Sequence, residues 1–148
     1  ARPYYEKILI LEPHHLEAHV GMAEIYRNQG YLARSQEHYE KVLIEWNNNE
    51  RIWRDYSQVL AGRRDYIKAT QAMNRALELK IDIESLLSLA RLNRLQSLKD
   101  EAYERLNQAM DLDREREEPL LQKSIWLMED NRLQESLNLV TALLEKNP

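Results

Sequence analysis

Histidine is the residue type whose spacing in this sequence most resembles a chemical site. The 148 residues include four histidines and no cysteine. His15 and His19 are four residues apart, a spacing that places two imidazoles on one helical face and can hold a metal ion, with Glu12, His14 and Glu17 nearby. Because the His-Glu-x-x-His spacing and thiolate ligands are both missing, we expect His14 and His15 to lie in a solvated turn and His19 to fill a packing position. We therefore expect no metal and no cofactor.

The carboxylates give no pattern of an acid and base pair. They are scattered along the chain as in solvated helix faces, and the charge run at residues 111–118 is expected to face solvent at a turn. Three glycines are too few for a loop that cradles phosphate, and a chain without cysteine has no thiol nucleophile. We expect no catalytic residue and no enzymatic activity.

Composition narrows the fold class and the partners. Only 3 glycines and 4 prolines occur, which disfavours a turn-rich β fold and favours helices. With 21 basic and 25 acidic residues the net charge is -4, which argues against nucleic acid and anionic membranes as partners. We expect a soluble chain without membrane insertion or signal peptide, and a chain without cysteine suits both the cytoplasm and the periplasm.

Small residues recur at a fixed interval along the sequence. Each of two series repeats every 34 residues and shortens to 33 at the same place, which predicts a single deletion in the turn at residues 80–82. One series is Ala23, Ser57, Ala90 and Ser124, and the other is Ala1, Ser35, Ala69, Ala102 and Ser136.

Aromatic, aliphatic and proline positions follow the same interval. The units carry Met22-Ala23, Tyr26, Ser35 and Tyr39; Trp53, Tyr56-Ser57, Ala69 and Ala76; Leu89-Ala90, Ala102 and Ala109; and Ser124, Leu127, Ser136 and Pro148. This pattern resembles the tetratricopeptide repeat (TPR) over essentially the whole chain. It departs from the usual repeat at the proline position, which holds Asn47, Ile81 and Arg114, at His19 where tryptophan is usual, and at Lys123 where leucine is usual.

The resemblance implies an all-α, right-handed superhelical solenoid of antiparallel helix pairs. We expect one domain over residues 1–148, with a half unit at 1–15 and units at 16–49, 50–82, 83–116 and 117–148. Nine helices are predicted at 1–12, 16–29, 33–46, 50–61, 66–79, 83–95, 99–112, 117–130 and 133–147. Gly30 and Gly62 should each adopt the left-handed conformation just past a helix end, and Pro119 should lie in the first turn of a helix.

In such a superhelix the first helix of each pair lines the concave side. Residues out of phase with the packing positions should face it: Glu17, Val20, Gly21, Glu24 and Asn28; Arg51, Arg54, Asp55 and Gln58; Leu87, Ser88, Arg91, Arg94 and Leu95; and Glu118, Leu121, Gln122, Ile125 and Met128. Within this set we predict ligand contacts at Arg54, Gln58, Leu87, Arg91, Arg94, Leu121, Ile125 and Met128.

The middle of the predicted concave surface is cationic and its C-terminal third is apolar. Such a surface would suit a peptide with an acidic group followed by aliphatic anchors. The alternative is that Arg54 and Arg91 pair with Asp55, Glu24 or Glu84 of adjacent helices, and the sequence leaves both open. Chaperone-binding TPR proteins hold an acidic tail with lysine and asparagine on successive first helices. The matching positions here carry only fragments of that clamp: Val20 and Glu24, Arg54 and Gln58, and Leu87 and Arg91.

We therefore expect a non-catalytic protein-protein interaction scaffold that binds a peptide or partner helix. One alternative is a structural repeat segment of a cell-envelope assembly or polysaccharide-export machine. Another is an RNA-binding helical repeat, which the net charge opposes. The sequence names no partner, organism, compartment or parent protein.

The two ends of the sequence add a prediction of self-association. The chain opens in a second helix without its first, and Pro148 stands on the position that leads into another unit, so we expect a piece of a longer array. The last predicted helix carries Leu133, Leu137, Leu139, Val140, Leu143 and Leu144, more apolar surface than one neighbour can cover. We expect the isolated chain to self-associate through its helical ends.

Overall fold

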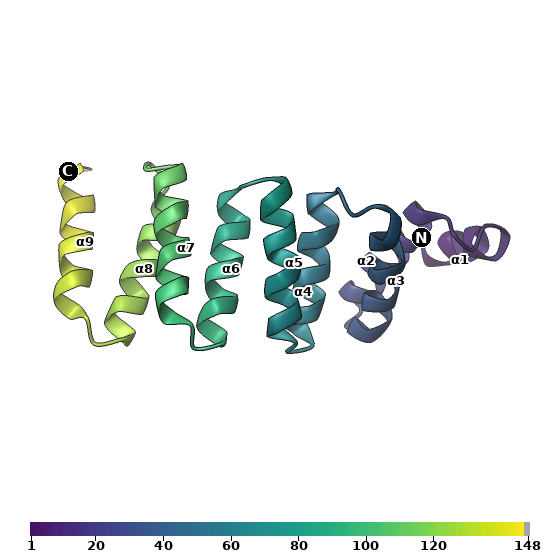
Figure 1. Cartoon of the computed structure of the whole chain (residues 1–148), viewed down its shortest axis with the longest axis horizontal. Helices are drawn as coiled ribbons and strands as arrows, with labels where there is room; N and C mark the ends of the chain where they lie inside the picture. The colour runs from purple at the N-terminus through teal and green to yellow at the C-terminus, as the bar shows by residue number, and fades with distance from the viewer. Residues whose placement is uncertain (147–148) are drawn as a thin grey trace. The chain divides into compact units, whose positions relative to one another are not determined.

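Nine α-helices and no strand make up the described part of the chain, residues 1–146 of a computed structural model (Figure 1). They form two compact units, Ala1–Ile81 and Asp82–Pro148. The first unit holds α1 (Arg2–Leu11), α2 (Leu16–Asn28), α3 (Leu32–Glu45), α4 (Glu50–Gly62) and α5 (Tyr66–Leu79); the second holds α6 (Ile83–Leu95), α7 (Lys99–Leu112), α8 (Glu117–Glu129) and α9 (Leu133–Lys146). The all-α prediction is confirmed, and each helix bound that falls within residues 1–146 agrees with its prediction to within one residue.

The repeated small residues meet in pairs where the two helices of a hairpin cross. Four pairs, each twelve residues apart, are at most 5% exposed: Ala23 with Ser35, Ser57 with Ala69, Ala90 with Ala102, and Ser124 with Ser136. The serine hydroxyls donate to the backbone carbonyl across the crossing, at 2.8 Å from Ser35 to Ala23, 2.7 Å from Ser57 to Ala69 and 3.0 Å from Ser136 to Ser124. A larger side chain would push the helix axes apart. Ala1, the first member of the second series, precedes α1 and is exposed.

Turns between successive helix pairs show where the repeat loses a residue. Four residues separate α1 from α2, α3 from α4, and α7 from α8, whereas only residues 80–82 separate α5 from α6. The predicted deletion is therefore confirmed, and the boundary between the two units falls in the same turn.

Turns inside the helix pairs share one left-handed residue each. Positive φ angles occur at Gly30 (81°), Arg64 (62°), Ser97 (62°) and Asn131 (59°), which are again 34, 33 and 34 residues apart. The prediction for Gly30 is confirmed, but that for Gly62 is wrong, because the left-handed residue of that turn is Arg64. Gly62 is the last residue of α4, and a Cβ there would lie 2.7 Å from Cδ1 of Leu32. Its small size therefore serves a close helix approach.

Helix starts follow ordinary capping chemistry. Side chains of Asn49, Asp65 and Asp82 accept hydrogen bonds from backbone N–H groups in the first turns of α4, α5 and α6. These bonds satisfy donors that have no partner inside the helix. Pro119 lies in the first turn of α8, as predicted, where its missing N–H costs no hydrogen bond.

The core of the first unit is built from the faces of α2, α3 and α4. Tyr39 and Val42 of α3 are buried there with Ile52 and Val59 of α4. Helix α1 packs closely on α2 at Gly21, since a Cβ there would lie 2.4 Å from the ring of Tyr5. No residue of α1 itself is fully buried.

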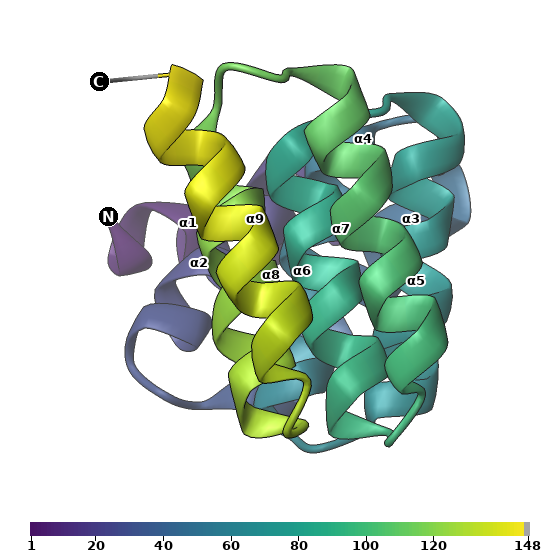
Figure 2. The same ribbon diagram turned by 90° about the vertical axis from the view of Figure 1, so that its left-hand side faces the viewer.

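The second unit has an open face on α9. Helix α6 buries eight residues and α7 buries four, but α9 buries only Ser136. Leu133, Leu137 and Leu144 are 60 to 63% exposed, and α9 lies in front in Figure 2. Pro148, which the repeat assigns to the proline position, lies outside the described residues. Among the described residues, no helix is long and apolar enough to span a bilayer.

Candidate binding surface

In the first unit, residues of α1, α2, α4 and the turn before α4 enclose a hollow. Its volume is about 280 Å³, and its lining combines apolar, aromatic and charged groups: Tyr5, Glu17, Val20, Gly21, Glu24, Trp46, Asn49, Arg51, Ile52 and Asp55. Six of these were expected to face the concave side from helix periodicity. Tyr5, Trp46, Asn49 and Ile52 were not, because they come from the preceding second helix, from a turn and from the packing face.

Two of the three carboxylates that line this hollow are already paired in the folded chain. Nη2 of Arg51 lies 2.8 Å from Oε1 of Glu24, and Nη1 of Arg27 lies 2.9 Å from Oδ1 of Asp55. Burial and the negative charge of Asp55 raise the pKa of Tyr39, whose hydroxyl is buried without a hydrogen-bond partner among the described residues. Arg51 and Arg27 thus neutralise Glu24 and Asp55, two of the carboxylates that the sequence offered to Arg54.

Arg54 and Gln58 lie one turn apart on α4, as predicted. Gln58 is exposed and Arg54 is half-buried. Neither lines the hollow. They therefore extend the α4 surface beside it.

In the second unit, a pocket of about 390 Å³ lies between α6 and α8. Arg91, Arg94, Leu95 and Trp126 line it. The guanidinium carbon of Arg94 lies 4.9 Å from the centroid of the Trp126 ring, which is a cation–π contact. This pocket thus has an aromatic floor and a cationic rim.

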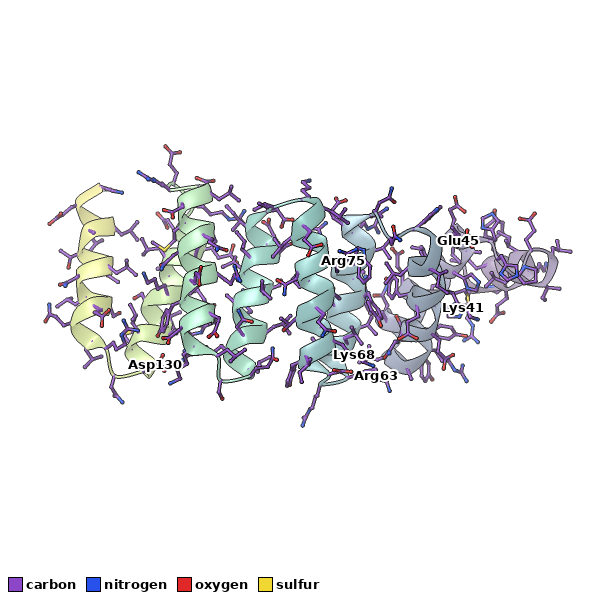
Figure 3. The ribbon with its side chains drawn as sticks, viewed as in Figure 1. Lys41, Glu45, Arg63, Lys68, Arg75 and Asp130 are labelled. Carbon is purple, nitrogen blue, oxygen red and sulfur yellow. The ribbon has the colours of Figure 1, made fainter. Side chains whose placement is uncertain are left out.

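Arg94 is held by carboxylates at the end of α8. Its Nη1 and Nη2 lie 3.0 and 3.2 Å from the two carboxylate oxygens of Asp130, and Nη2 lies 2.9 Å from Oε2 of Glu129. Nζ of Lys99 and the hydroxyl of Tyr103 also donate to Asp130, at 2.7 and 2.6 Å. Donation from Arg94, Lys99 and Tyr103 lowers the pKa of Asp130. This centre, visible at the α8–α9 turn in Figure 3, has no local sequence signal because its partners are 27 to 36 residues apart.

The remaining predicted residues divide into exposed and buried ones. Leu121, Ile125 and Met128 are 46, 46 and 48% exposed in a row along α8. The Arg91 side chain is about half exposed, with Nη2 4.0 Å from Oε1 of Glu118. Leu87 is 2% exposed and offers no surface, so its predicted place in the apolar wall is corrected to a place in the core. Glu84, which the sequence offered as a partner of Arg91, pairs with Arg116 at 2.6 Å.

The histidines considered as metal ligands have structural partners. Nδ1 of His15 accepts from the backbone N–H of Ala18 at 3.2 Å and caps α2. His19 is 5% exposed, and its ring nitrogens lie 2.8 Å from Nδ1 of His38 and 2.9 Å from the carbonyl of Pro13. Within residues 1–146, no group of three or more potential ligands is placed to hold a metal ion.

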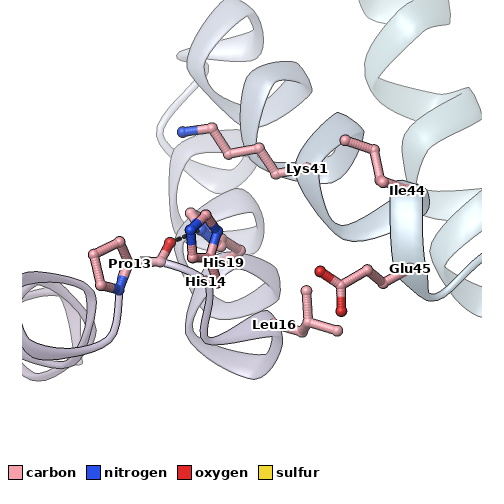
Figure 4. A pocket seen from close by; sticks show the side chains of 7 residues that line it. All are labelled: Pro13, His14, Leu16, His19, Lys41, Ile44 and Glu45. Atoms are coloured by element: carbon pink, nitrogen blue, oxygen red, sulfur yellow. Dashed lines mark hydrogen bonds between the residues drawn. The ribbon is translucent and has the colours of Figure 1, made fainter.

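A second pocket of the first unit lies beside these histidines. It has a volume of about 470 Å³ and is drawn in Figure 4 with the bond between His19 and Pro13. Its lining residues are Pro13, His14, Leu16, His19, Lys41, Ile44 and Glu45. The sequence marked His19 as a packing position but gave no signal for His38, which lies 19 residues away.

Comparison with solved structures gives the class of fold. MamA superposes with a TM-score of 0.87 at 15% identity, over 98% of this chain and 85% of that one. YrrB, described as a TPR protein with an unusual peptide-binding site, superposes with a TM-score of 0.76 at 18% identity, over 100% of this chain and 77% of that one. PilF of Pseudomonas aeruginosa superposes with a TM-score of 0.73 at 21% identity, over 93% of this chain and 65% of that one.

No protein-family profile and no curated protein sequence matches the chain. At these identities the structural likeness is one of fold. The chain has the all-α helical-repeat fold of tetratricopeptide-repeat proteins, which confirms the fold that the 34-residue pattern implied.

Proposed function

We propose that the chain is a non-catalytic interaction scaffold that binds a peptide or a partner helix on the first helices of its repeats. The observation that carries this proposal is the row of Leu121, Ile125 and Met128 on α8, each close to half exposed. Their spacing of four and three residues places them on one helical face. Adjacent exposed apolar side chains of this kind mark a surface that binds another molecule.

Arg91 supplies the polar contact of this surface. It lines the pocket between α6 and α8 together with Leu95, which is 59% exposed. An acidic side chain of the ligand would meet Arg91, while aliphatic side chains would cover the α8 row. The N–H groups of Arg94 already bind Glu129 and Asp130. Arg94 would therefore contact the ligand with the flat face of its guanidinium, which lies over Trp126.

In the first unit the proposed contacts are Arg54 and Gln58 on α4, next to the hollow between α2 and α4. Glu17, Glu24 and Asp55 line that hollow, against one lining arginine, Arg51. Because Arg51 and Arg27 are already paired with Glu24 and Asp55, this hollow offers phosphate no surplus positive charge, which supports a protein ligand over RNA.

A library of random peptides displayed on phage tests this proposal because it requires no particular partner. We expect selection on the chain to enrich peptides with aliphatic residues and an aspartate or glutamate. Binding of the selected peptide, measured by calorimetry, should weaken at least about tenfold in Arg91→Glu and in Ile125→Lys, because each removes one class of contact.

Arg114→Glu is the matched control, since it reverses an exposed arginine of the same unit outside the proposed surface. It should leave binding unchanged. Selected peptides that bind equally well to Arg91→Glu, or that depend on residues of the second helices, would contradict the proposal. Pull-down of RNA in place of protein would favour the RNA-binding alternative.

A further inference from the structure

Two histidines of the first unit share a hydrogen bond in a partly buried place. His19 of α2 is 5% exposed, and His38 of α3 is half-buried. Their Nδ1 atoms are 2.8 Å apart, and the ring centroids are 5.0 Å apart. Nε2 of His19 lies 2.9 Å from the backbone carbonyl of Pro13. His19, His38 and this carbonyl are called the histidine latch below.

The chemistry of the partners fixes where the protons lie. A carbonyl oxygen can only accept, so Nε2 of His19 must carry a hydrogen. In neutral His19 the other nitrogen, Nδ1, is then an acceptor. Nδ1 of neutral His38 must therefore donate to it. The latch assigns the Nε2–H tautomer to His19 and the Nδ1–H tautomer to His38.

The number of protons that the latch can hold follows from this assignment. One added proton leaves a single hydrogen between the two Nδ1 atoms, so the bond persists as a charge-assisted one. A second added proton puts a hydrogen on both Nδ1 atoms. Two donors then face each other at 2.8 Å, and two positive charges lie side by side with little water. The doubly charged latch cannot keep this geometry.

The surroundings of the latch oppose the second charge further. Burial, and the positive charges of His19 and Lys41, lower the pKa of His38 to about 4. The guanidinium groups of Arg2 and Arg34 lie 5.4 and 5.5 Å from the ring centroid of Tyr26, which stacks on His38. The other titratable groups near the latch are Glu45 in the adjoining pocket, His14 and His15 in the preceding turn, Glu17 beside His15, and Glu6, which pairs with Arg2.

Two contacts connect the latch to helix α1. The carbonyl of Pro13 belongs to the turn that joins α1 to α2, and Tyr26 of the stack meets Arg2 of α1. Helix α1 has no fully buried residue of its own to hold it. It also supplies Tyr5 to the lining of the hollow between α2 and α4.

We propose that the histidine latch is an acid-sensitive switch: when both histidines are protonated, the His19 ring leaves its place between His38 and the Pro13 carbonyl, which frees the α1–α2 turn together with α1. Release removes Tyr5 from Gly21 and opens the hollow at that side. Release should progress as the pH falls from the ordinary histidine pKa of 6.5 toward 4, because a released His38 takes up its proton at the ordinary pKa whereas the latched His38 does so only near pH 4. This inference concerns α1 and does not depend on the proposed ligand.

Hydrogen exchange of the full chain, corrected for the intrinsic pH dependence of exchange, tests the switch. Between pH 7 and pH 4.5, we expect protection of residues 1–15 to fall at least about tenfold while α4 and α5 stay protected. His38→Gln should abolish this pH dependence, because its side-chain N–H can still donate to His19 but it does not titrate. His14→Gln is the control, and it should respond to pH as the wild type does.

Imidazole nitrogen NMR provides a second readout that does not depend on the variants folding. At pH 8 it should report the Nε2–H tautomer for His19 and the Nδ1–H tautomer for His38. The proposal is overturned by the opposite tautomer of His19, or by protection of residues 1–15 that persists to pH 4. It is also overturned if α4 and α5 lose protection together with α1, or if His38→Gln opens with the same pH dependence as the wild type.

Discussion

Ser57 and Ala69 touch across the crossing of α4 and α5, where the serine hydroxyl donates a 2.7 Å hydrogen bond to the alanine carbonyl. Ser35 makes the same bond to Ala23 between α2 and α3. The crossing therefore admits a side chain no larger than serine, and the hydroxyl ties the two helices together. This contact explains why the 34-residue interval is carried by small residues.

The crossing leads to a prediction on stability. Ala69→Leu should lower the free energy of unfolding by about 1 to 3 kcal/mol, because the added side chain must displace a helix at a fully buried position. Urea unfolding followed by circular dichroism measures this change. Ala33→Leu, an exposed alanine of α3, is the control and should change little. Equal stability of the two variants would mean that the crossing tolerates larger residues.

The left-handed turns yield a second prediction. Gly30→Ala should destabilise the chain by about 1 kcal/mol, because a Cβ is strained at a φ of 81° even though nothing lies near it. Arg64→Gly should stabilise by up to about 1 kcal/mol, because Arg64 holds the equivalent position with a side chain. Thermal unfolding compares both variants with the wild type. A gain in Gly30→Ala or a loss in Arg64→Gly would contradict the argument.

Most of the fold is predictable from this sequence because the repeat contains two kinds of information. The apolar period places each helix, and the 34-residue interval fixes which helices pair and where the deletion falls. Gly62 shows the limit of such reasoning. A glycine near a helix end fits both a left-handed turn and a close approach, and only the position of Leu32 in space decides between them.

Helix α9 provides a third prediction. Leu133, Leu137 and Leu144 expose 60 to 63% of their surface, so the isolated chain should self-associate as its concentration rises. Leu137→Lys should weaken this association at least about tenfold, as measured by sedimentation velocity. Leu11→Lys changes an 82% exposed leucine of α1 and tests whether the other end takes part. A strict monomer at high concentration would show that the α9 face does not self-associate.

The candidate surface is less predictable than the fold, and its arginines show why. Helix periodicity gives the side of the helix on which Arg54, Arg91 and Arg94 lie. It cannot give the partner of each charge, because Asp130 comes to Arg94 from 36 residues away. The prediction for Leu87 is wrong for a related reason. Neighbouring side chains cover its side of α6, and periodicity alone does not distinguish a covered side from an open one. The predicted apolar row on α8 lies within a single helix, so the shared face of its residues follows from their spacing alone.

The bond between Tyr103 and Asp130 leads to the fourth prediction. Burial, together with the hydrogen bond to Asp130, raises the pKa of Tyr103 to about 12 from its ordinary value of 10. The folded chain therefore holds this proton more tightly than the unfolded chain does. The resulting stabilisation is complete below pH 10 and is lost as the pH rises from 10 to 12, because the unfolded chain then ionises first.

Urea unfolding at pH 8, 10, 11 and 12 should detect this loss as a comparison between two variants. At pH 8, Tyr103→Phe should be less stable than the wild type because Asp130 loses a donor, and the difference should shrink as the pH rises toward 12. Tyr4, 66% exposed on α1, is the control, and the difference between Tyr4→Phe and the wild type should not change with pH over the same range. A difference at Tyr103 that is constant from pH 8 to 12 would mean that the hydroxyl does not keep its proton through its bond to Asp130.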